Sequence, residues 1–346
     1  MPPNETVAPQ ESGDPALPPA EPRRKKQRYI AGGLVLALLA LVFVVASSDP
    51  DTVPADTVSN ITVPDNSSFA NPEPVTIEGY SGPQQDPVIS PDGQYLFFDT
   101  HTDVDKPMHL YWAKRVDYKT FTFLGRVPGV EHEGIEGALD TEGNFYFISP
   151  PAFLPEGGTT MGRGVFANDT VTGIAPIRGV APATAPAGTE ILTFDMAITP
   201  DSKTLYFSEF VLKKGAGTGP RAIKGAKLSV ATKNADGSFT RLPNADEILK
   251  NVNGLGALVY NATPSSDGLT LVFNAAPYFG PLPRMYIATR SSTSAAFGQP
   301  ERVGAAEQIE QGTLSEPGSF SHDGTHLYFH RVLTERTSQL YVLTRQ

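Results

Sequence analysis

The chain has 346 residues, with 37 acidic against 27 basic side chains and a formal net charge of −10 at neutral pH. It contains no cysteine, which excludes a disulfide framework and a paired-cysteine metal site. The acidic balance argues against nucleic acid as a partner.

The N-terminal part predicts a membrane anchor. Residues 1–28 are rich in Pro, Glu and Ala without a hydrophobic period, so we expect a disordered tail. Residues 29–46 carry no charge, and as a helix they are about 27 Å long, enough to cross a bilayer core. The basic residues from Arg23 to Arg28 predict a signal anchor with a cytoplasmic N-terminus. The alternative is a signal peptide cleaved near Ala46.

A linker and an exported domain are expected after the anchor. Residues 47–73 have many Pro, Ser, Thr and Asp residues and no Lys or Arg, which is typical of a flexible tether. The remainder, residues 74–346, is then the folded domain. We expect a single-pass membrane protein whose domain lies outside the cytoplasm, in a periplasm or at the cell surface.

A tight acidic turn recurs along this domain, at intervals of roughly 50 to 66 residues, a spacing typical of propeller blades. Such a turn joins two antiparallel strands, with a proline that presets φ and a glycine for the left-handed position. The turns are Ser90-Pro91-Asp92-Gly93, Asp140-Thr141-Glu142-Gly143, Thr199-Pro200-Asp201-Ser202, Ser265-Ser266-Asp267-Gly268 and Ser321-His322-Asp323-Gly324.

The residues after each turn fall into aligned columns that predict a buried strand. The first apolar column is followed two positions later by a second one, and a small or polar residue comes next. A further aligned strand ends in Lys or Arg in most repeats. The columns are Leu96, Tyr146, Leu205, Leu271 and Leu327; Phe98, Ile148, Phe207, Phe273 and Phe329; and Asp99, Ser149, Ser208, Asn274 and His330.

The repeats predict an all-β fold, a five-bladed β-propeller with four strands in each blade. The last repeat reaches Gln346 with only three strands. We expect the strand-like segment Val75 to Tyr80 to complete it and close the ring. A sixth blade in 243–260 is the alternative, but Ala245 to Lys250 reads as a short helix.

The turns resemble the TolB-type, WD40-like propeller repeat, in which a Pro-x-x-Ser-Pro-Asp-Gly signature precedes a hydrophobic strand. Residues Pro87 to Gly93 match this signature fully, and Pro317 to Gly324 match it with His322 in place of the second proline. The resemblance covers about 270 residues and implies the fold. Propellers of this kind serve binding, scaffolding and catalysis alike.

The longer connections should lie together on the face opposite the tight turns, and binding residues concentrate on such loops. We call this the long-loop face. It comprises the loops 101–108, 128–135, 151–163, 179–194, 211–225, 243–260, 277–284, 304–315 and 332–338.

A polar residue begins each predicted inner strand at this face, and we expect these side chains to point toward the axis. Carboxylates gathered in one funnel repel one another, which raises some pKa values or recruits a cation such as Ca²⁺. The alternative is an architectural role, in which each carboxylate accepts hydrogen bonds from strand-end N–H groups. The residues, called the ring residues below, are Asp86, Glu136, Asp195, Asn261 and Glu316, and the metal candidates among them are Asp86, Glu136, Asp195 and Glu316.

The ring is also similar to that of the five-bladed glycosidases that act on arabinan and xylan. These enzymes use a base, an acid and a carboxylate that tunes their pKa values. The resemblance implies catalytic roles for Asp86, Glu136 and Asp195, with Asp86 as the base. The family is expected to carry Asp in blade two and Glu in blade three, whereas this chain has Glu136 and Asp195 there.

The sequence favours a binding, sensor or scaffold module that recruits a protein, peptide or glycan through the long-loop face. The alternative function is glycoside hydrolysis by the ring carboxylates. Three histidines, His322, His326 and His330, are expected at surface or rim positions without converging. His101, Asp103 and Asp105 alternate in one loop, and Lys213 to Lys224 form a basic loop; we expect both to be solvated.

Overall fold

A computed structural model describes residues 61–100, 108–130, 134–149, 161–180, 183–214, 223–277, 283–310, 314–334 and 337–346. The predicted tail 1–28, the predicted anchor 29–46 and the first part of the predicted linker lie outside these ranges. Within them, no helix is both long enough and apolar enough to cross a bilayer.

The described part is an all-β structure, as the sequence predicts, with a few short helices. These helices are α2 (Ala245–Ile248), α3 (Lys250–Asn253) and the 3₁₀ helix η5 (Gly304–Glu307). The short helix expected over 245–250 is therefore confirmed in α2, and no strand forms between α2 and Leu258 in the described chain.

The strands follow one another in antiparallel groups. The third and fourth groups belong to one sheet, joined by a single parallel bridge from Ala226 to Leu258. The first group is β3 (Gln85–Ile89), β4 (Tyr95–Asp99), β5 (Leu110–Arg115) and β6 (Thr120–Arg126); the second is β7 (Ile135–Leu139), β8 (Asn144–Ile148), β9 (Met161–Ala167) and β10 (Thr170–Pro176); the third is β11 (Thr189–Ile198), β12 (Thr204–Lys213), β13 (Ile223–Lys233) and β14 (Phe239–Arg241); the fourth is β15 (Leu258–Pro264), β16 (Thr270–Ala276), β17 (Arg284–Thr289) and β18 (Glu301–Arg302); and the last is β19 (Leu314–Phe320), β20 (His326–Thr334) and β21 (Thr337–Arg345).

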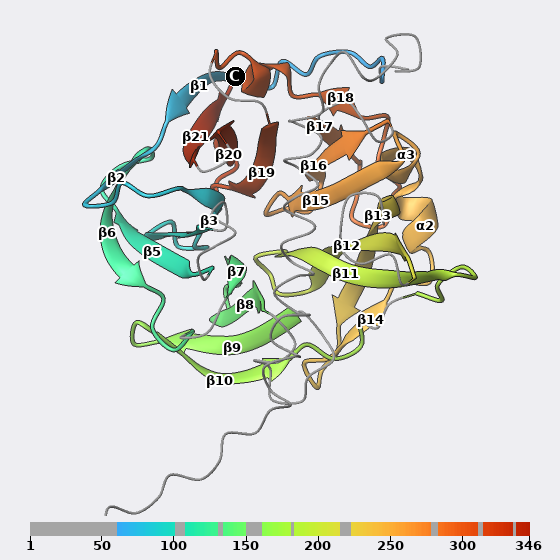
Figure 1. The fold of residues 1–346 in the computed structure, drawn as a ribbon, viewed down its shortest axis with the longest axis horizontal. Helices are drawn as coiled ribbons and strands as arrows, with labels where there is room; N and C mark the ends of the chain where they lie inside the picture. Colours follow the sequence, from blue (N-terminus) through green and yellow to red (C-terminus); the bar gives the residue numbers. More distant parts are fainter. Residues whose placement is uncertain are drawn as a thin grey trace, which may run out of the picture.

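These groups surround a central axis, which is the plan of a β-propeller (Figure 1). The first strand of each group lies nearest the axis. Each of these inner strands contacts the next one around the circle, from β3 through β7, β11, β15 and β19 back to β3. The inner strands therefore enclose a channel on all sides.

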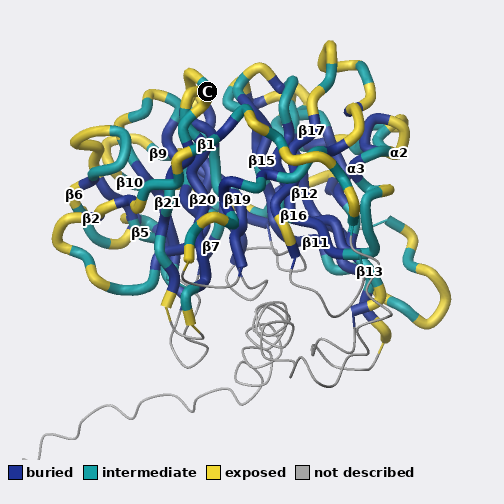
Figure 2. Tube along the Cα trace, turned by 90° about the horizontal axis from the view of Figure 1, so that it is seen from above, coloured by how far each residue is buried: buried dark blue, intermediate teal, exposed yellow. Residues whose placement is uncertain are grey.

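The predicted apolar columns form the interior between the sheets. Every member of both columns, from Leu96 to Phe329, is at most 1% exposed. Figure 2 shows the buried strands at the centre and the exposed chain at the rim. The burial predicted from the period-2 alternation is confirmed, because each strand is packed on both of its faces.

The tight turns also form as predicted. In four of them a Ser or Thr hydroxyl donates to the aspartate two residues later, for example Ser265 to Asp267 at 2.6 Å. The fourth turn residue has positive φ in all five, and Gly93 is typical with φ +71°. Ser202 adopts the same conformation, with φ +64°, where the other turns have glycine.

The strand that completes the last sheet differs from the predicted one. Strand β1 (Phe69–Pro74) pairs antiparallel with β21, whereas the expected segment Val75 to Tyr80 contains β2 (Thr76–Glu78), which pairs parallel with β6. Two prolines in β1 made it resemble a linker. An edge strand tolerates proline because its outward N–H groups need no partner.

Part of the predicted linker is likewise folded onto the domain. Ile61 and Val63 pack against the buried cluster of the third and fourth groups. Asp65 forms an ion pair with Arg302, at 2.6 and 3.1 Å. The folded chain therefore begins before residue 74, and no later than residue 61.

Candidate functional site

The ring residues stand at an irregularity of each inner strand. Four inner strands are bulged at the ring residue, whereas β19 is bulged at Gly318, just after Glu316. The ring residues of those four strands adopt a left-handed conformation that non-glycine residues rarely use. In β11 and β15 the strand begins several residues earlier than predicted, so Asp195 and Asn261 lie inside it. The left-handed residues are Asp86 (φ +45°), Glu136 (+53°), Asp195 (+45°) and Asn261 (+54°).

A polar side chain from the preceding strand group holds several ring residues in place. The Glu136 N–H donates to Asp99 Oδ2 at 2.9 Å, and the Asn261 N–H donates to Ser208 Oγ at 3.1 Å. The Asp86 backbone nitrogen lies 3.2 Å from His330 Nδ1, an atom that accepts a hydrogen bond only in the neutral imidazole. Asp99 and Ser208, two members of the small or polar column, therefore link their strand group to the next one, because a bulge frees an N–H that must find another acceptor.

Glu136 and Asp195 form a carboxyl–carboxylate pair that joins β7 to β11. Glu136 Oε2 and Asp195 Oδ2 are inaccessible to solvent, with no hydrogen-bond partner among the described residues. Burial raises the pKa of Glu136 well above its usual value, and the charges of Asp195 and Asp86 raise it further. Burial also raises the pKa of Asp195 to about 7. A proton on Glu136 relieves the repulsion between the two carboxyl groups.

His330 compensates the negative charges of two other ring carboxylates. Its Nδ1 lies 3.4 Å from Asp86 Oδ1, and its Nε2 lies 3.3 Å from Glu316 Oε2. Burial alone lowers the pKa of His330, but the two carboxylates outweigh it and raise the pKa to about 10. The imidazole is therefore charged at neutral pH. Tyr260 adds a neutral donor, with its hydroxyl 2.8 Å from Glu316 Oε1.

The structure thus brings together the four carboxylates that the sequence placed in one funnel. Asp86, Asp195 and Glu316 are each 8% exposed. With one proton on the Glu136–Asp195 pair and one charge on His330, the group keeps a net negative charge. Within the described ranges, no three His, Asp or Glu side chains are arranged to hold a metal ion, so the geometry lends the predicted Ca²⁺ site no support.

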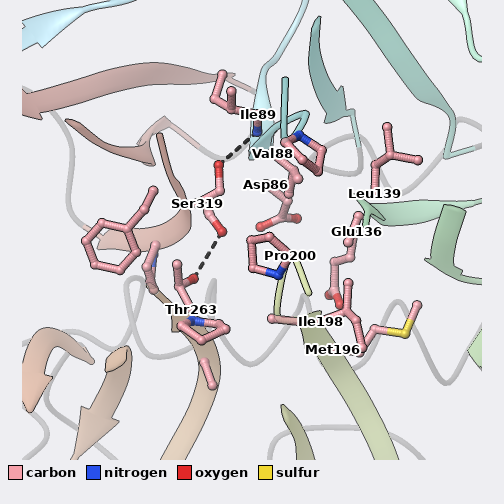
Figure 3. A pocket seen from close by; sticks show the side chains of 18 of the residues that line it. Asp86, Val88, Ile89, Glu136, Leu139, Met196, Ile198, Pro200, Thr263 and Ser319 are labelled. Atoms are coloured by element: carbon pink, nitrogen blue, oxygen red, sulfur yellow. Dashed lines mark hydrogen bonds between the residues drawn. The ribbon is translucent and has the colours of Figure 1, made fainter. Parts of the chain in front are cut away.

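A cavity of about 80 Å³ lies directly beside this ring, inside the channel. Asp86, Glu136 and Asn261 line one end of it, and the carboxylates of Asp86 and Glu136 point into it (Figure 3). The cavity runs toward the tight turns, where Pro200 and His322 line it. It therefore lies on the opposite side of the ring from the long-loop face.

The cavity exists because the inner strands carry short side chains just past the ring. Ala138, Ala197 and Gly318 all line it. A Cβ atom added to Gly318 would lie 2.2 Å from the Pro87 carbonyl oxygen, so β19 approaches β3 too closely for a side chain there. Ser319 Oγ accepts from the Ile89 N–H at 2.9 Å and fixes this junction (Figure 3).

Sequence reasoning missed two members of the site, His330 and Tyr260. His330 was expected at the surface or rim but is fully buried, because its column faces the neighbouring inner strand. The position of His330 in the polar column was the available signal. His326 instead stacks on Tyr118, and His322 lies in an exposed turn, so the histidines do not converge, as predicted.

The weaker candidates are not part of the site. His101, Asp103 and Asp105 lie outside the described residues, as does most of the basic loop from Lys213 to Lys224. Much of the long-loop face also lies outside the described residues, so its role in binding stays a prediction.

No protein-family model and no curated protein matches the sequence. Solved structures do. TolB from Acinetobacter baumannii is 14% identical over 77% of this chain and 55% of its own, with a TM-score of 0.37. A family 117 glycoside hydrolase from Zobellia galactanivorans is 12% identical over 81% and 91%, at 0.44. Sucrose-6-phosphate hydrolase from Lactobacillus gasseri is 12% identical over 89% and 64%, at 0.48.

The chain spans about half the length of the TolB chain that it matches. Identities and scores of this size do not bear on activity. TolB and glycoside hydrolases, the two kinds of protein that the repeat and the ring resemble, are both among the solved structures similar to this chain.

Proposed function

We propose that this chain is a membrane-anchored, extracytoplasmic five-bladed β-propeller that acts as a binding module. The closed circle of inner strands β3, β7, β11, β15 and β19 supports the blade count. The pairing of β1 with β21 supports closure of the last blade by an N-terminal strand. The apolar segment 29–46, preceded by basic residues, supports the anchor and its orientation.

The single observation that carries the binding role is the burial of Asp86, the candidate base, beside His330, whose Nδ1 lies 3.4 Å from Asp86 Oδ1. A general base must accept a proton, and a neighbouring cation makes a carboxylate less basic. The ring is instead a polar floor of Asp86, Glu136, Asp195, Asn261 and Glu316 beneath a protein, peptide or glycan ligand.

Glycoside hydrolysis is the second candidate, and one observation favours it. Glu136 has a raised pKa and faces the same cavity as Asp86. A protonated carboxyl beside a second carboxylate is the combination that an acid and a base require. In this function Glu136 is the acid, Asp86 the base, and Asp195 tunes the pKa of Glu136.

Two measurements on the full-length chain in detergent micelles separate the candidates. The first is binding to a peptide and glycan array, and the second is hydrolysis of a panel of aryl glycosides. We expect array binding that Asp86→Asn weakens at least tenfold and no turnover above background. Turnover that Glu136→Gln and Asp86→Asn both abolish would establish the hydrolase instead. Neither binding nor turnover would reject both functions.

A further inference from the structure

The cavity beside the ring is polar at one end and apolar along its walls. Its polar end consists of Asp86 on β3, Glu136 on β7 and Asn261 on β15. Beyond them the walls are mainly apolar, with hydroxyl residues Ser90, Thr263, Ser266 and Ser319 among them. The apolar wall includes Val88, Leu139, Met196, Ile198 and Phe320.

The charges at the polar end are only partly compensated from within the protein. His330 faces Asp86 and Glu316 from β20, and Tyr260 faces Glu316 from β15. Asp99 on β4 adds its negative charge near Glu136. Asp195 is more than nine-tenths buried, yet its Oδ2 has no donor among the described residues. The Oε2 of Glu136 has none either.

We propose that this cavity binds the ammonium group of an aliphatic primary amine, such as a lysine side chain of a partner peptide, with its alkyl stem along the apolar walls. The inference rests on the proposed binding function and specifies the chemistry of its ligand. The amine enters from the side of the tight turns, where the cavity is lined by Pro91, Pro200, Ser266 and His322.

An ammonium group fits the donor and acceptor pattern of this end. It is a compact cation with three N–H donors. The acceptors come from three strands: the carboxylates of Asp86 and Glu136 and the side-chain oxygen of Asn261. A cavity of about 80 Å³ accommodates an alkyl chain with such a head more readily than the wide planar fork of a guanidinium.

Binding of the amine should release a proton. An ammonium group beside Glu136 favours the ionised carboxylate and so displaces a proton from the buried Glu136–Asp195 pair. Asp195 titrates near pH 7, so the pair holds fewer protons as the pH rises above this value. His330 keeps its charge over this range, and its contribution is constant. Amine affinity should therefore increase between pH 6 and pH 8.

Calorimetric titration of the full-length chain in detergent micelles tests the proposal. The probes are n-pentylamine, its neutral isostere 1-pentanol and tetramethylammonium, which is charged but has no N–H donor. We expect pentylamine to bind at least tenfold more tightly than either of the other two. Its binding enthalpy should depend on the ionisation enthalpy of the buffer, which reports proton release.

Variants locate the site. Asp86→Asn should weaken pentylamine binding at least tenfold, and Asn261→Asp, which tolerates the left-handed backbone and adds a charge, should strengthen it several-fold. Glu142→Gln, on an exposed turn, is the matched control and should leave binding unchanged. A thermal melt of each variant establishes that it is folded. If Asp86→Asn does not fold, Asn261→Asp still tests the site.

The outcomes separate this inference from the proposed function. Equal binding of pentylamine and 1-pentanol, or pentylamine binding that none of the ring variants changes, would overturn the inference. Array binding of a peptide or glycan together with no amine binding would retain the binding module and reject its amine specificity. Failure of both measurements would reject the binding module itself.

Discussion

The Nδ1 atom of His330 lies 3.4 Å from the Oδ1 atom of Asp86, although 244 residues separate the two in the chain. This contact joins the last sheet to the first at the channel. Neutral Nδ1 accepts from the Asp86 N–H, and protonated Nδ1 donates to the Asp86 carboxylate. The flanking carboxylates favour the protonated form, so the closure of the ring includes a buried ion pair.

Removal of this histidine should be strongly destabilising. His330→Phe leaves Asp86 and Glu316 buried without a cation, and loss of one partner of a buried pair costs about 3–5 kcal/mol. Urea unfolding at pH 7 measures the change. His322→Asn, in an exposed turn, is the control and should shift the free energy of unfolding by less than about 0.5 kcal/mol. A His330→Phe loss below about 1 kcal/mol would contradict the ion pair.

The Glu136–Asp195 pair predicts a stability that falls as the pH rises. Both groups have a folded-state pKa above the unfolded value, so their protonated forms stabilise the fold. This contribution is full below about pH 4 and is lost as the pH rises through the folded-state pKa, which is about 7 for Asp195. Melting temperatures from pH 4 to pH 8 should therefore decline through this pair.

The variant Glu136→Gln should flatten that decline. Glutamine is uncharged at every pH and, like the protonated carboxyl, offers a donor beside Asp195. We expect a melting temperature at pH 8 equal to or above that of the parent chain. Glu142→Gln, whose carboxylate is exposed and pairs with Lys233, should leave the slope with pH unchanged. A melting temperature lowered at pH 8 by Glu136→Gln would show that the carboxylate is required in charged form.

The hydrogen bond from the Asn261 N–H to Ser208 Oγ links two strand groups and should contribute to the free energy of unfolding as a buried hydrogen bond does. Ser208→Ala removes the acceptor of the Asn261 N–H, which is then left unpaired, at a cost of about 1–3 kcal/mol. Chemical denaturation is the measurement, and Ser292→Ala, on an exposed loop, is the matched control. Equal stability of the two variants would argue that the bulged backbone at Asn261 does not depend on this hydrogen bond.

The closing strand should be required for folding. Phe69 in β1 is 1% exposed and packs against Phe320, with ring centroids 5.7 Å apart. We expect Phe69→Ala to cost about 3–5 kcal/mol, whereas Leu124→Ala, at an exposed residue, should cost less than about 0.5 kcal/mol. A chain that begins at residue 61 should unfold cooperatively, and one that begins at residue 75 should not. Cooperative melting of the shorter chain at the same temperature would show that β1 is dispensable.

The positions of the ring residues could be predicted from the sequence because they recur at the same place in each repeat. Asp86, Glu136, Asp195, Asn261 and Glu316 occupy one register, and equivalent strands bring equivalent residues to one axis. Which of them pair was not predictable. That depends on the proton of Glu136 and on His330, and both are set by burial against strands that are distant in the sequence.

The sequence by itself determined the strands, their turns and their columns, because these depend on neighbours within a few residues: alternation along one strand, a proline and a glycine in one turn. Only the tertiary structure decided that Phe69–Pro74 closes the last sheet, that His330 neutralises Asp86, and that the cavity lies toward the tight turns. These features depend on contacts between the two ends of the chain and on the small volumes of Ala138, Ala197 and Gly318, which leave space only after the inner strands meet.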